Sequence, residues 1–353
     1  MKEHVNIPVF IPHLGCPNLC VFCNQRYISG CERFDPSGVR SLIDTALSTV
    51  REGQKAQIAF FGGSFTGIGT ELMTSLLDTA QSFISEGRAD SIRLSTRPDY
   101  ISEEILTVLS RYSVRTVELG IQSMSDKVLL SSKRGHTADD SESAAALIKD
   151  FGFEFVSQLM IGLPSSSPED EIMSAKKCCE MGADAARIYP TVVFRDSELC
   201  DMTVRGEYEP LTLEQAVERT RNVYGIFCEN GVPCIRIGLC SSDGVSSDDK
   251  YYAGPNHPAI REMVENSMYF DSISKALSGK YGSGPFTGRD LKVTVPARCM
   301  SKAVGHKREN AERLRAVYGF RTVIFNESPS LSGYDVTAEL SPVFSDSNDR
   351  DHH

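Results

Sequence analysis

The sequence has no run approaching the roughly 20 consecutive apolar residues that a membrane-spanning helix requires. Its first residues, MKEHVNIPVF, lack the charged-then-apolar layout of a secretory signal, and a proline interrupts their apolar stretch. The 11 cysteines are odd in number and accompany no sign of export. We therefore expect a cytoplasmic protein with no membrane partner, in which clustered cysteines serve metal binding or catalysis rather than disulfides.

The overall composition is that of a globular protein. Of the 353 residues, 41% are hydrophobic and 24% charged, which excludes an intrinsically disordered chain. The 37 basic and 47 acidic side chains give a formal charge of -10, which argues mildly against nucleic-acid binding by the chain as a whole. Domains usually have roughly 100–200 residues, so the length predicts one large domain and a smaller one.

Strand-like apolar segments alternate with amphipathic segments from residue 5 to about residue 240. The strand-like segments are residues 5–13, 56–63, 91–98, 116–123, 153–163, 185–194 and 232–239. One long helical region is expected over 125–151. This alternation predicts an α/β fold with a parallel sheet covered by helices, best described as a partial, open β/α barrel. A doubly wound sheet is the alternative.

Polar or glycine-rich strings follow five of these strand-like segments, each at the point where the strand should end. They are GGSF (62–65), TRPD (96–99), QS (122–123), GLP (162–164) and YP (189–190). Glycine and proline at such places can simply terminate strands. Because the carboxyl ends of parallel strands meet at one edge of a sheet, five in succession favour a shared active face.

A cysteine loop follows the first strand-like segment. Cys16, Cys20 and Cys23 have C-x3-C-x2-C spacing. Three thiolates on one loop can hold three irons of a [4Fe–4S] cluster and leave the fourth iron open. A zinc site completed by Cys31 or His13 is one alternative, because structural zinc needs a fourth ligand. A group of buried structural thiols is the other alternative.

With Phe22 just before its last cysteine, this loop resembles that of the radical S-adenosylmethionine (SAM) superfamily. Members are partial β/α barrels in which the amino and carboxylate groups of SAM chelate the open iron. Reductive cleavage of SAM gives a 5′-deoxyadenosyl radical that abstracts a hydrogen atom from the substrate. The resemblance therefore implies a [4Fe–4S] cluster on Cys16, Cys20 and Cys23, bound SAM, and an external one-electron donor such as flavodoxin or ferredoxin.

Further strings are similar to superfamily motifs: GGS (62–64), ELGIQS followed by SKRGHT, and QLMIGLP (158–164). STRPD is similar to a third-strand motif that usually reads ETRPD, but Ser95 replaces the glutamate. The resemblance implies a cofactor-binding set of Phe22, Gly62, Gly63, Ser64, Thr96, Gln122, Arg134, Gln158 and Arg187. Arg134 is expected to pair with the methionyl carboxylate, because a guanidinium offers a bidentate fork.

The strings STRPDY, VELGIQS, KRGHT, GLP and RIYPTVV most resemble the Elongator complex protein 3 group. Members with the full architecture modify the wobble uridine of tRNA and carry a C-terminal acetyltransferase domain. Only about 110 residues follow the expected barrel, without a recognisable acetyl-CoA loop, so we expect a relative that lacks the acetyltransferase domain. The coproporphyrinogen oxidase-like branch usually has a further cysteine two positions beyond the third, where this chain has Gln25.

The C-terminal part reads as a separate, basic module. The predicted divisions are a barrel over 1–240, a connecting helical extension over 241–285, a small α/β domain over 286–340 and a disordered tail over 341–353. The small domain should run strand, helix, GHKR turn, helix, strand, which resembles a KH module except that Arg308 replaces the second glycine. Lys302, Lys307 and Arg308 are its candidate nucleic-acid contacts. An ordinary module with a solvated basic face is the alternative.

These observations predict a radical SAM enzyme that abstracts a substrate hydrogen, with RNA or tRNA as one substrate class. An RNA-binding protein whose cluster is a redox sensor is a second hypothesis. A radical SAM oxidoreductase acting on a small metabolite or tetrapyrrole is a third. Hydrogen abstraction needs no acid or base from the protein, so no catalytic residue is named, and His257 between prolines is read as a turn residue rather than a lid residue.

Overall fold

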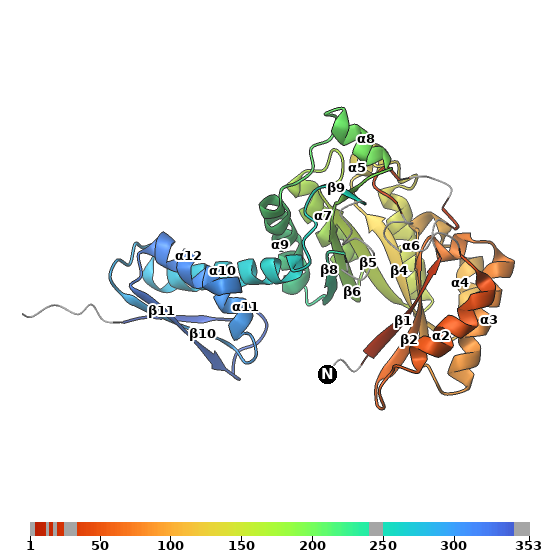
Figure 1. Ribbon diagram of the computed structural model, residues 1–353, viewed down its shortest axis with the longest axis horizontal. Coiled ribbons are helices and arrows are strands. Elements are labelled where there is room, and N and C mark those ends of the chain that lie inside the picture. Colours follow the sequence, from red (N-terminus) through yellow and green to blue (C-terminus); the bar gives the residue numbers. More distant parts are fainter. Residues whose placement is uncertain (1–3, 12–13, 17–19, 25–33, 240–249, 342–353) are drawn as a thin grey trace, which may run out of the picture. The chain divides into compact units, whose positions relative to one another are not determined.

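The computed structural model describes residues 4–11, 14–16, 20–24, 34–239 and 250–341. The chain divides into two compact units, Met1–Pro258 and Ala259–His353 (Figure 1). This division lies between the boundaries predicted at residues 240 and 285. Most of the predicted tail, 342–353, lies outside the described residues.

A seven-stranded parallel sheet forms the centre of the first unit. Its strands are β1 (His4–Ile11), β2 (Lys55–Gly62), β3 (Ser91–Thr96), β4 (Val114–Gln122), β5 (Glu154–Ile161), β6 (Ala185–Pro190) and β8 (Cys234–Ile237). They pair in chain order, with β1 at one edge and β8 at the other. A doubly wound sheet reverses its strand order at a switch point. The order seen here has no reversal, so the α/β open barrel is confirmed and the alternative was wrong.

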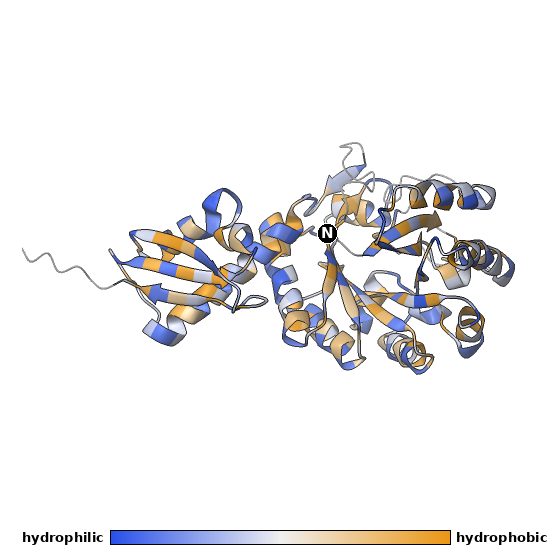
Figure 2. Ribbon diagram, turned by 90° about the horizontal axis from the view of Figure 1, so that it is seen from below, coloured by the Kyte–Doolittle hydropathy of each residue, from blue (hydrophilic) through white to orange (hydrophobic). Residues whose placement is uncertain are grey.

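Helices follow most of these strands. They are α2 (Val39–Leu47), α3 (Thr70–Ser85), α4 (Glu103–Leu109), α5 (Asp126–Ser131), α6 (Ala138–Asp150), α7 (Pro168–Glu180), α8 (Glu198–Val204) and α9 (Leu213–Glu229). Right-handed crossovers that always advance in the same direction place their helices on one face of the sheet. Figure 2 shows this arrangement, in which the strands form an open arc with helices along its outer side.

The two faces of the sheet differ in chemistry. Phe60, Leu94 and Leu119 are fully buried and belong to the apolar layer between strands and helices. The alternate positions on the same strands carry polar side chains, such as Arg93 and Glu118. Successive side chains on a strand point to opposite faces, so the concave face opposite the helices is polar.

The predicted strand over 185–194 was wrong in extent. The chain leaves the sheet after Pro190, and residues Val193–Phe194 form a separate short strand, β7. This strand pairs antiparallel with β9 (Tyr251–Ala253). Pro190 has no backbone N–H to donate to a neighbouring strand, although the next residue, Thr191, still donates its N–H to the Ile161 carbonyl on β5 at 2.8 Å.

The predicted helical region over 125–151 was also wrong in extent, since it forms two helices, α5 and α6. Helix α5 ends at Ser131, and Lys133, with a positive φ of 52°, leaves the right-handed helical conformation. Thr137 and Asp140 then form a capping box that begins α6. A break at this point brings Arg134 and its neighbours out of the helix and beside the sheet edge.

The described residues of the second unit form three α-helices, a short 3-10 helix (His306–Arg308) and a three-stranded sheet. Its elements are α10 (Ile260–Tyr281), β10 (Asp290–Pro296), α11 (Met300–Val304), α12 (Glu309–Tyr318), β11 (Thr322–Ser328) and β12 (Thr337–Leu340). Strand β10 is central, parallel to β11 and antiparallel to β12. The predicted order of strand, helix, turn, helix, strand is confirmed. Helix α10 contributes Tyr269, Phe270 and Ile273 to the apolar core of this unit.

A membrane-crossing helix would have to be longer or more apolar than any helix found in the described parts of the chain.

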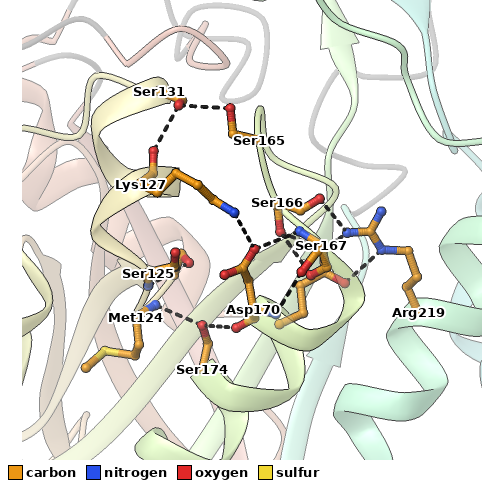
Figure 3. Close-up of polar contacts among 12 residues, drawn as sticks. Met124, Ser125, Lys127, Ser131, Ser165, Ser166, Ser167, Asp170, Ser174 and Arg219 are labelled. Atoms are coloured by element: carbon orange, nitrogen blue, oxygen red, sulfur yellow. Dashed lines mark hydrogen bonds and ion pairs between the residues drawn. The ribbon is translucent and has the colours of Figure 1, made fainter.

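A polar clamp fixes the loop that follows β5 (Figure 3). Glu171 lies in the first turn of α7, and its carboxylate accepts hydrogen bonds from the Gly162 N–H at 2.6 Å and from the Ser166 hydroxyl at 3.2 Å. The Arg219 guanidinium, from α9, binds the same carboxylate through two nitrogens at 2.7 and 2.9 Å. Burial raises the pKa of Glu171, while Arg219 and the Gly162 N–H oppose that rise. The loop thus rests on one buried ion pair.

Replacing Glu171 with alanine should lower the free energy of unfolding of the first unit by about 3 kcal/mol, because it leaves the half-buried Arg219 without its partner. The matched control is Glu142→Ala, which removes the exposed pair with Lys177 and should cost less than about 0.5 kcal/mol. Urea unfolding followed by circular dichroism measures both. Equal losses in the two variants would contradict this account of the clamp.

Candidate functional site

The cysteine loop lies at the carboxyl end of β1 and is tied to two other loops. Cys23 N–H donates to the Cys20 carbonyl at 3.0 Å, which closes a tight turn. Between them, Val21 N–H donates to the Ser132 carbonyl and the Val21 carbonyl accepts from Leu199 N–H. The loop is thereby held from both sides by segments that follow β4 and β6.

Phe22 is partly buried against an apolar cluster of Val21, Val193, Leu199 and Tyr208. This packing anchors the loop, and a contact of Phe22 with a cofactor stays a prediction. His13 and Cys31, the alternative zinc ligands, lie outside the described residues.

The GGS string packs directly against the cysteine loop. Gly63 N–H donates to the Ile11 carbonyl at 2.8 Å, and Ser64 N–H donates to the Leu14 carbonyl at 3.1 Å. A Cβ atom on Gly63 would lie 2.1 Å from the Leu14 oxygen, which no real structure tolerates. The Ser64 hydroxyl also lies 3.5 Å from the Cys16 sulfur. Glycine is therefore required here for loop-to-loop packing, before any cofactor is considered.

Arg134 connects the cysteine loop to the sheet. Its guanidinium is buried, and it donates from Nη1 to the Cys20 sulfur at 3.3 Å and from Nη2 to the Gly120 carbonyl on β4 at 2.5 Å. Cysteine binds metals as the thiolate, and a guanidinium N–H beside a sulfur stabilises that negative charge. The Arg134 side chain thus points at the predicted cluster ligand.

Arg97 supports Arg134 and was not singled out from the sequence. Its Nη2 donates to the Arg134 carbonyl at 2.5 Å, while Asp99 holds its guanidinium in a bidentate pair at 2.8 and 2.9 Å. Burial alone would lower the pKa of Arg97, but Asp99 outweighs it and raises that pKa. The Arg-Pro-Asp spacing of the TRPD string is the sequence signal for this pair.

His136 is a second buried group that the sequence interpretation passed over, although it stands in the KRGHT string. Its Nε2 lies 3.3 Å from the Ile121 carbonyl. Burial first, and the neighbouring Arg134 second, lower the pKa of His136 to about 4. The imidazole is therefore neutral at pH 7.

Three nitrogens beside the cysteine loop are buried and lack a hydrogen-bond partner among the described residues: Arg97 Nη1, Arg134 Nε and His136 Nδ1. Buried polar atoms in native proteins are nearly always paired with protein, water or ligand. Two of the three belong to guanidinium groups. The chemistry of this place suits a bound carboxylate.

Gln122, the last residue of β4, meets Gln158, which lies within β5. Gln158 Nε2 donates to Gln122 Oε1 at 3.4 Å, and Gln122 adopts a positive φ of 70°. Non-glycine residues with positive φ are uncommon and cluster at functional sites. Thr96 is placed differently, because its buried hydroxyl is bonded to the Thr66 hydroxyl at 2.6 Å. In this structure the Thr96 hydroxyl supports the neighbouring loop.

Arg187 belongs to an ion cluster on the concave face. Its guanidinium and that of Arg93 both donate to the buried Glu118 carboxylate, at 2.9 and 2.5 Å. Ser95 donates to the same carboxylate at 3.3 Å. Burial alone would lower the pKa of Arg187, but Glu118 and then Tyr189 raise it. The structure therefore places Arg187 in an ion pair with Glu118, while its buried Nε lacks a hydrogen-bond partner among the described residues.

The donor set fits an iron–sulfur cluster, with three thiols on one loop and a buried cation beside Cys20. Across the described ranges, no three Cys, His, Asp or Glu side chains lie close enough together to form a ready-made metal group. The structure thus brings Cys16, Cys20 and Cys23 to one sheet edge without drawing their sulfurs into one coordination shell.

Comparison with known protein families gives two matches along the chain. Residues 10–177 match the Radical SAM superfamily, and residues 183–269 match the Radical_SAM C-terminal domain. The chain is 36% identical over 149 residues to the tRNA uridine(34) acetyltransferase of Methanocaldococcus jannaschii, covering 41% of this chain and 28% of that protein. It is 27% identical over 249 residues to Elongator complex protein 3 of Schizosaccharomyces pombe, covering 59% and 46%. The matched regions thus span less than half of these two relatives.

Solved structures share the fold. The archaeal Elp3 of Methanocaldococcus infernus, with an N-terminal deletion, superposes with a TM-score of 0.59 at 22% identity, covering 79% of this chain and 68% of that one. Streptococcus suis SuiB bound to S-adenosylmethionine gives a TM-score of 0.51 at 13% identity, covering 70% and 53%. At these identities the likeness establishes the open barrel alone.

Replacing Gly63 with alanine should push the GGS string away from the cysteine loop, because the new methyl group would meet two backbone oxygens. We expect a loss of about 1–3 kcal/mol in the free energy of unfolding, together with lower iron content after anaerobic reconstitution. Gly225→Ala on α9 is the control, since nothing lies within 4 Å and helix propensity should make it neutral or slightly stabilising. Wild-type iron content in the Gly63 variant would contradict the close-packing requirement.

His136 should make the stability of the first unit depend on pH. Its folded pKa of about 4 lies below the ordinary value near 6.5, so between these values the unfolded chain binds the proton and the folded chain does not. Stability should therefore fall as pH drops, with this side chain contributing a loss of about 2 kcal/mol between pH 7 and pH 5.

Urea unfolding of the wild type and of His136→Gln at both pH values measures this difference. The glutamine variant should lack that part of the pH dependence, whereas His306→Gln, at an exposed histidine, should retain it. Identical pH profiles for the wild type and His136→Gln would show that His136 titrates as an ordinary histidine.

Proposed function

The chain belongs to the radical SAM superfamily, and on that premise we propose that it is an enzyme that cleaves S-adenosylmethionine reductively and turns the resulting radical on RNA. The superfamily uses a [4Fe–4S] cluster and S-adenosylmethionine. The observation that carries the proposal is the cysteine loop at the carboxyl end of β1 with the buried Arg134 guanidinium on Cys20.

Cys16, Cys20 and Cys23 would hold three irons as thiolates, with the fourth iron open to S-adenosylmethionine. When bound, the cluster and this cofactor supply one-electron cleavage of the C5′–S bond, yielding methionine and a 5′-deoxyadenosyl radical that removes a hydrogen atom from the substrate. An external one-electron donor, of the flavodoxin or ferredoxin kind, would reduce the site in a reducing cytoplasm.

The methionyl carboxylate would be bound by Arg134, whose buried Nε lacks a hydrogen-bond partner in the described structure, as does the Arg97 Nη1. Asp99 and the Arg134 carbonyl already fix Arg97, so both guanidinium groups are oriented before the ligand arrives. Backbone of Gly62, Gly63 and Ser64 would approach the amino group, and the Gln122–Gln158 pair would reach the ribose or methionyl part.

Arg187 and Thr96 enter the proposal as supports. Glu118 holds Arg187 over the Phe61 ring at 5.2 Å, which makes a rigid wall on the concave face. The Thr96 hydroxyl is bonded to the Thr66 hydroxyl, which in turn donates to the Tyr100 carbonyl. Hydrogen abstraction needs no proton transfer from the protein, so Glu118 serves orientation here rather than acid–base chemistry.

RNA is the proposed substrate class because the curated relatives include enzymes named for tRNA uridine acetylation and Elongator complex proteins. The chain spans less than half of those proteins, so the acetyl transfer named for the Methanocaldococcus jannaschii protein is not part of the proposal. What is proposed is a radical modification of RNA at an undetermined position.

Anaerobically reconstituted wild-type protein should contain about four irons per chain and form 5′-deoxyadenosine from S-adenosylmethionine and dithionite. A Cys20→Ala variant should lose the cluster and form 5′-deoxyadenosine only at background. Cys179→Ala is the matched control, because this thiol on α7 lies outside the cysteine loop and should retain both properties. Absorbance, iron analysis and liquid chromatography provide the readouts.

Absence of 5′-deoxyadenosine from fully loaded wild-type protein would refute the radical reaction. In the same assay, unfractionated tRNA should raise the rate of formation, and tRNA digested by ribonuclease should not. If intact tRNA did not raise the rate, the proposal of RNA as the substrate would be wrong, while the radical reaction would remain supported.

A further inference from the structure

The turn between α11 and α12 in the second unit has a geometry that its sequence does not favour. Lys307 (φ 48°, ψ 31°) and Arg308 (φ 67°, ψ 25°) are consecutive left-handed residues, and both carry long side chains. L-residues other than glycine visit this region reluctantly. The turn therefore has to be held by its surroundings.

The side chain of the buried Asn310 holds the turn by bonding to two backbone carbonyls, one of them that of Asn266. Asn310, in the first turn of α12, donates from Nδ2 to the Ala303 carbonyl at 3.0 Å and to the Asn266 carbonyl at 2.7 Å. Gly305, at the start of the turn, lies so close to Asn310 that a Cβ atom would be 3.0 Å from its backbone nitrogen. The two helices are thus joined tightly behind Gly305–Arg308.

Lys302 has a structural partner, unlike the other two candidate nucleic-acid contacts. Its ammonium is 2.8 Å from the carboxylate of Glu265, which is buried on α10 and also pairs with Arg261 at 3.0 Å. A buried carboxylate needs such compensation. Lys302 therefore anchors α11 to α10, and its charge is neutralised by Glu265 within the unit.

Lys307 and Arg308 are exposed and form no ion pair with any described residue. Two other exposed cations of this unit are paired, Arg315 with Glu312 and Arg321 with Asp290. Lys292 and Arg298 also form no ion pair with a described residue, but neither has a second unpaired cation next to it in the sequence. In a chain with 10 more acidic than basic side chains, two adjacent uncompensated cations on a rigid turn form a distinct anion-attracting point.

The order of elements around this turn is similar to that of a nucleic-acid-binding module. A KH module grips about four nucleotides of single-stranded backbone with a G-x-x-G loop between two helices. Here the parallel strands β10 and β11 are joined through α11, the Gly305–Arg308 turn and α12. Arg308 replaces the second glycine yet adopts a left-handed conformation that glycine takes readily, so the substitution adds a cation without excluding the turn.

We propose that the Gly305–Arg308 turn docks single-stranded RNA through its phosphate backbone, with Lys307 and Arg308 making the phosphate contacts. This inference rests on the proposed RNA substrate but not on the radical reaction itself. The family matches end at residue 269, so the turn lies beyond the segments that define the chain's superfamily. We do not expect the turn to select a particular RNA sequence, because phosphate contacts position a strand and do not specify its bases.

The test uses the full-length reconstituted protein and a short fluorescein-labelled oligouridylate, with binding followed by fluorescence anisotropy across a salt series. The double variant K307Q/R308Q should bind at least about tenfold more weakly, and its slope of log K against log salt should be shallower by about 1.4, since each lost phosphate contact on a single strand is worth about 0.7.

The matched control is K292Q/R315Q, which removes two positive charges from the same unit, one on strand β10 and one at the end of α12. It should leave affinity and slope close to those of the wild type. Equal weakening in both double variants would overturn the proposal, because it would show a diffuse field rather than a docking turn. Unchanged binding in K307Q/R308Q would overturn it as well.

A second readout separates this inference from the proposed reaction. Formation of 5′-deoxyadenosine with dithionite and no RNA should be the same in K307Q/R308Q as in the wild type, whereas its stimulation by tRNA should be lost. Wild-type protein that cleaves S-adenosylmethionine but binds neither tRNA nor oligouridylate would defeat the docking proposal and leave the radical chemistry intact.

Discussion

The hydrogen bond from Arg134 to the Cys20 sulfur is the contact on which the rest of the site depends. It closes a chain of interactions that runs from Asp99 through Arg97 to the Arg134 carbonyl, and from the Arg134 guanidinium to Gly120 and Cys20. Segments following three strands are joined in this way at one edge of the sheet. These interactions position the cysteine loop and leave Arg97 Nη1 and Arg134 Nε buried without a partner among the described residues. Because unpaired buried donors are costly, we expect a ligand to bind to them.

The open barrel separates stability from chemistry by assigning them to opposite faces of the sheet. Apolar residues such as Phe60 and Leu119 pack against the helices, while Arg93, Glu118 and Arg187 occupy the concave face. One carboxylate shared by two guanidinium groups leaves a net positive charge there, but the charges are held by one another. Glu118 on the concave face is therefore committed to ion pairs, which is compatible with hydrogen abstraction because that step needs no acid or base from the protein.

Sequence reasoning found what short motifs encode and missed what long-range packing creates. The cysteine loop, Gln122 and Arg134 were predicted because each stands in a compact string, and the parallel sheet followed from the alternation of segments. The Glu118–Arg187 and Glu171–Arg219 pairs join residues 69 and 48 positions apart, and no local sequence pattern predicts such partners. The predicted strand and helix were too long at Pro190 and at Ser131, because the backbone changes direction there although the apolar pattern continues.

Net charge is a poor guide to partners when charges are unevenly compensated. The total of -10 suggested weak attraction to nucleic acid, yet what a phosphate meets is the local field left after ion pairing. Glu265 removes Lys302 from that field, whereas Lys307 and Arg308 remain in it on a turn fixed by Asn310. An acidic protein can therefore present a small cationic docking point without a broad basic surface, which favours weak, position-setting contacts with RNA over tight indiscriminate binding.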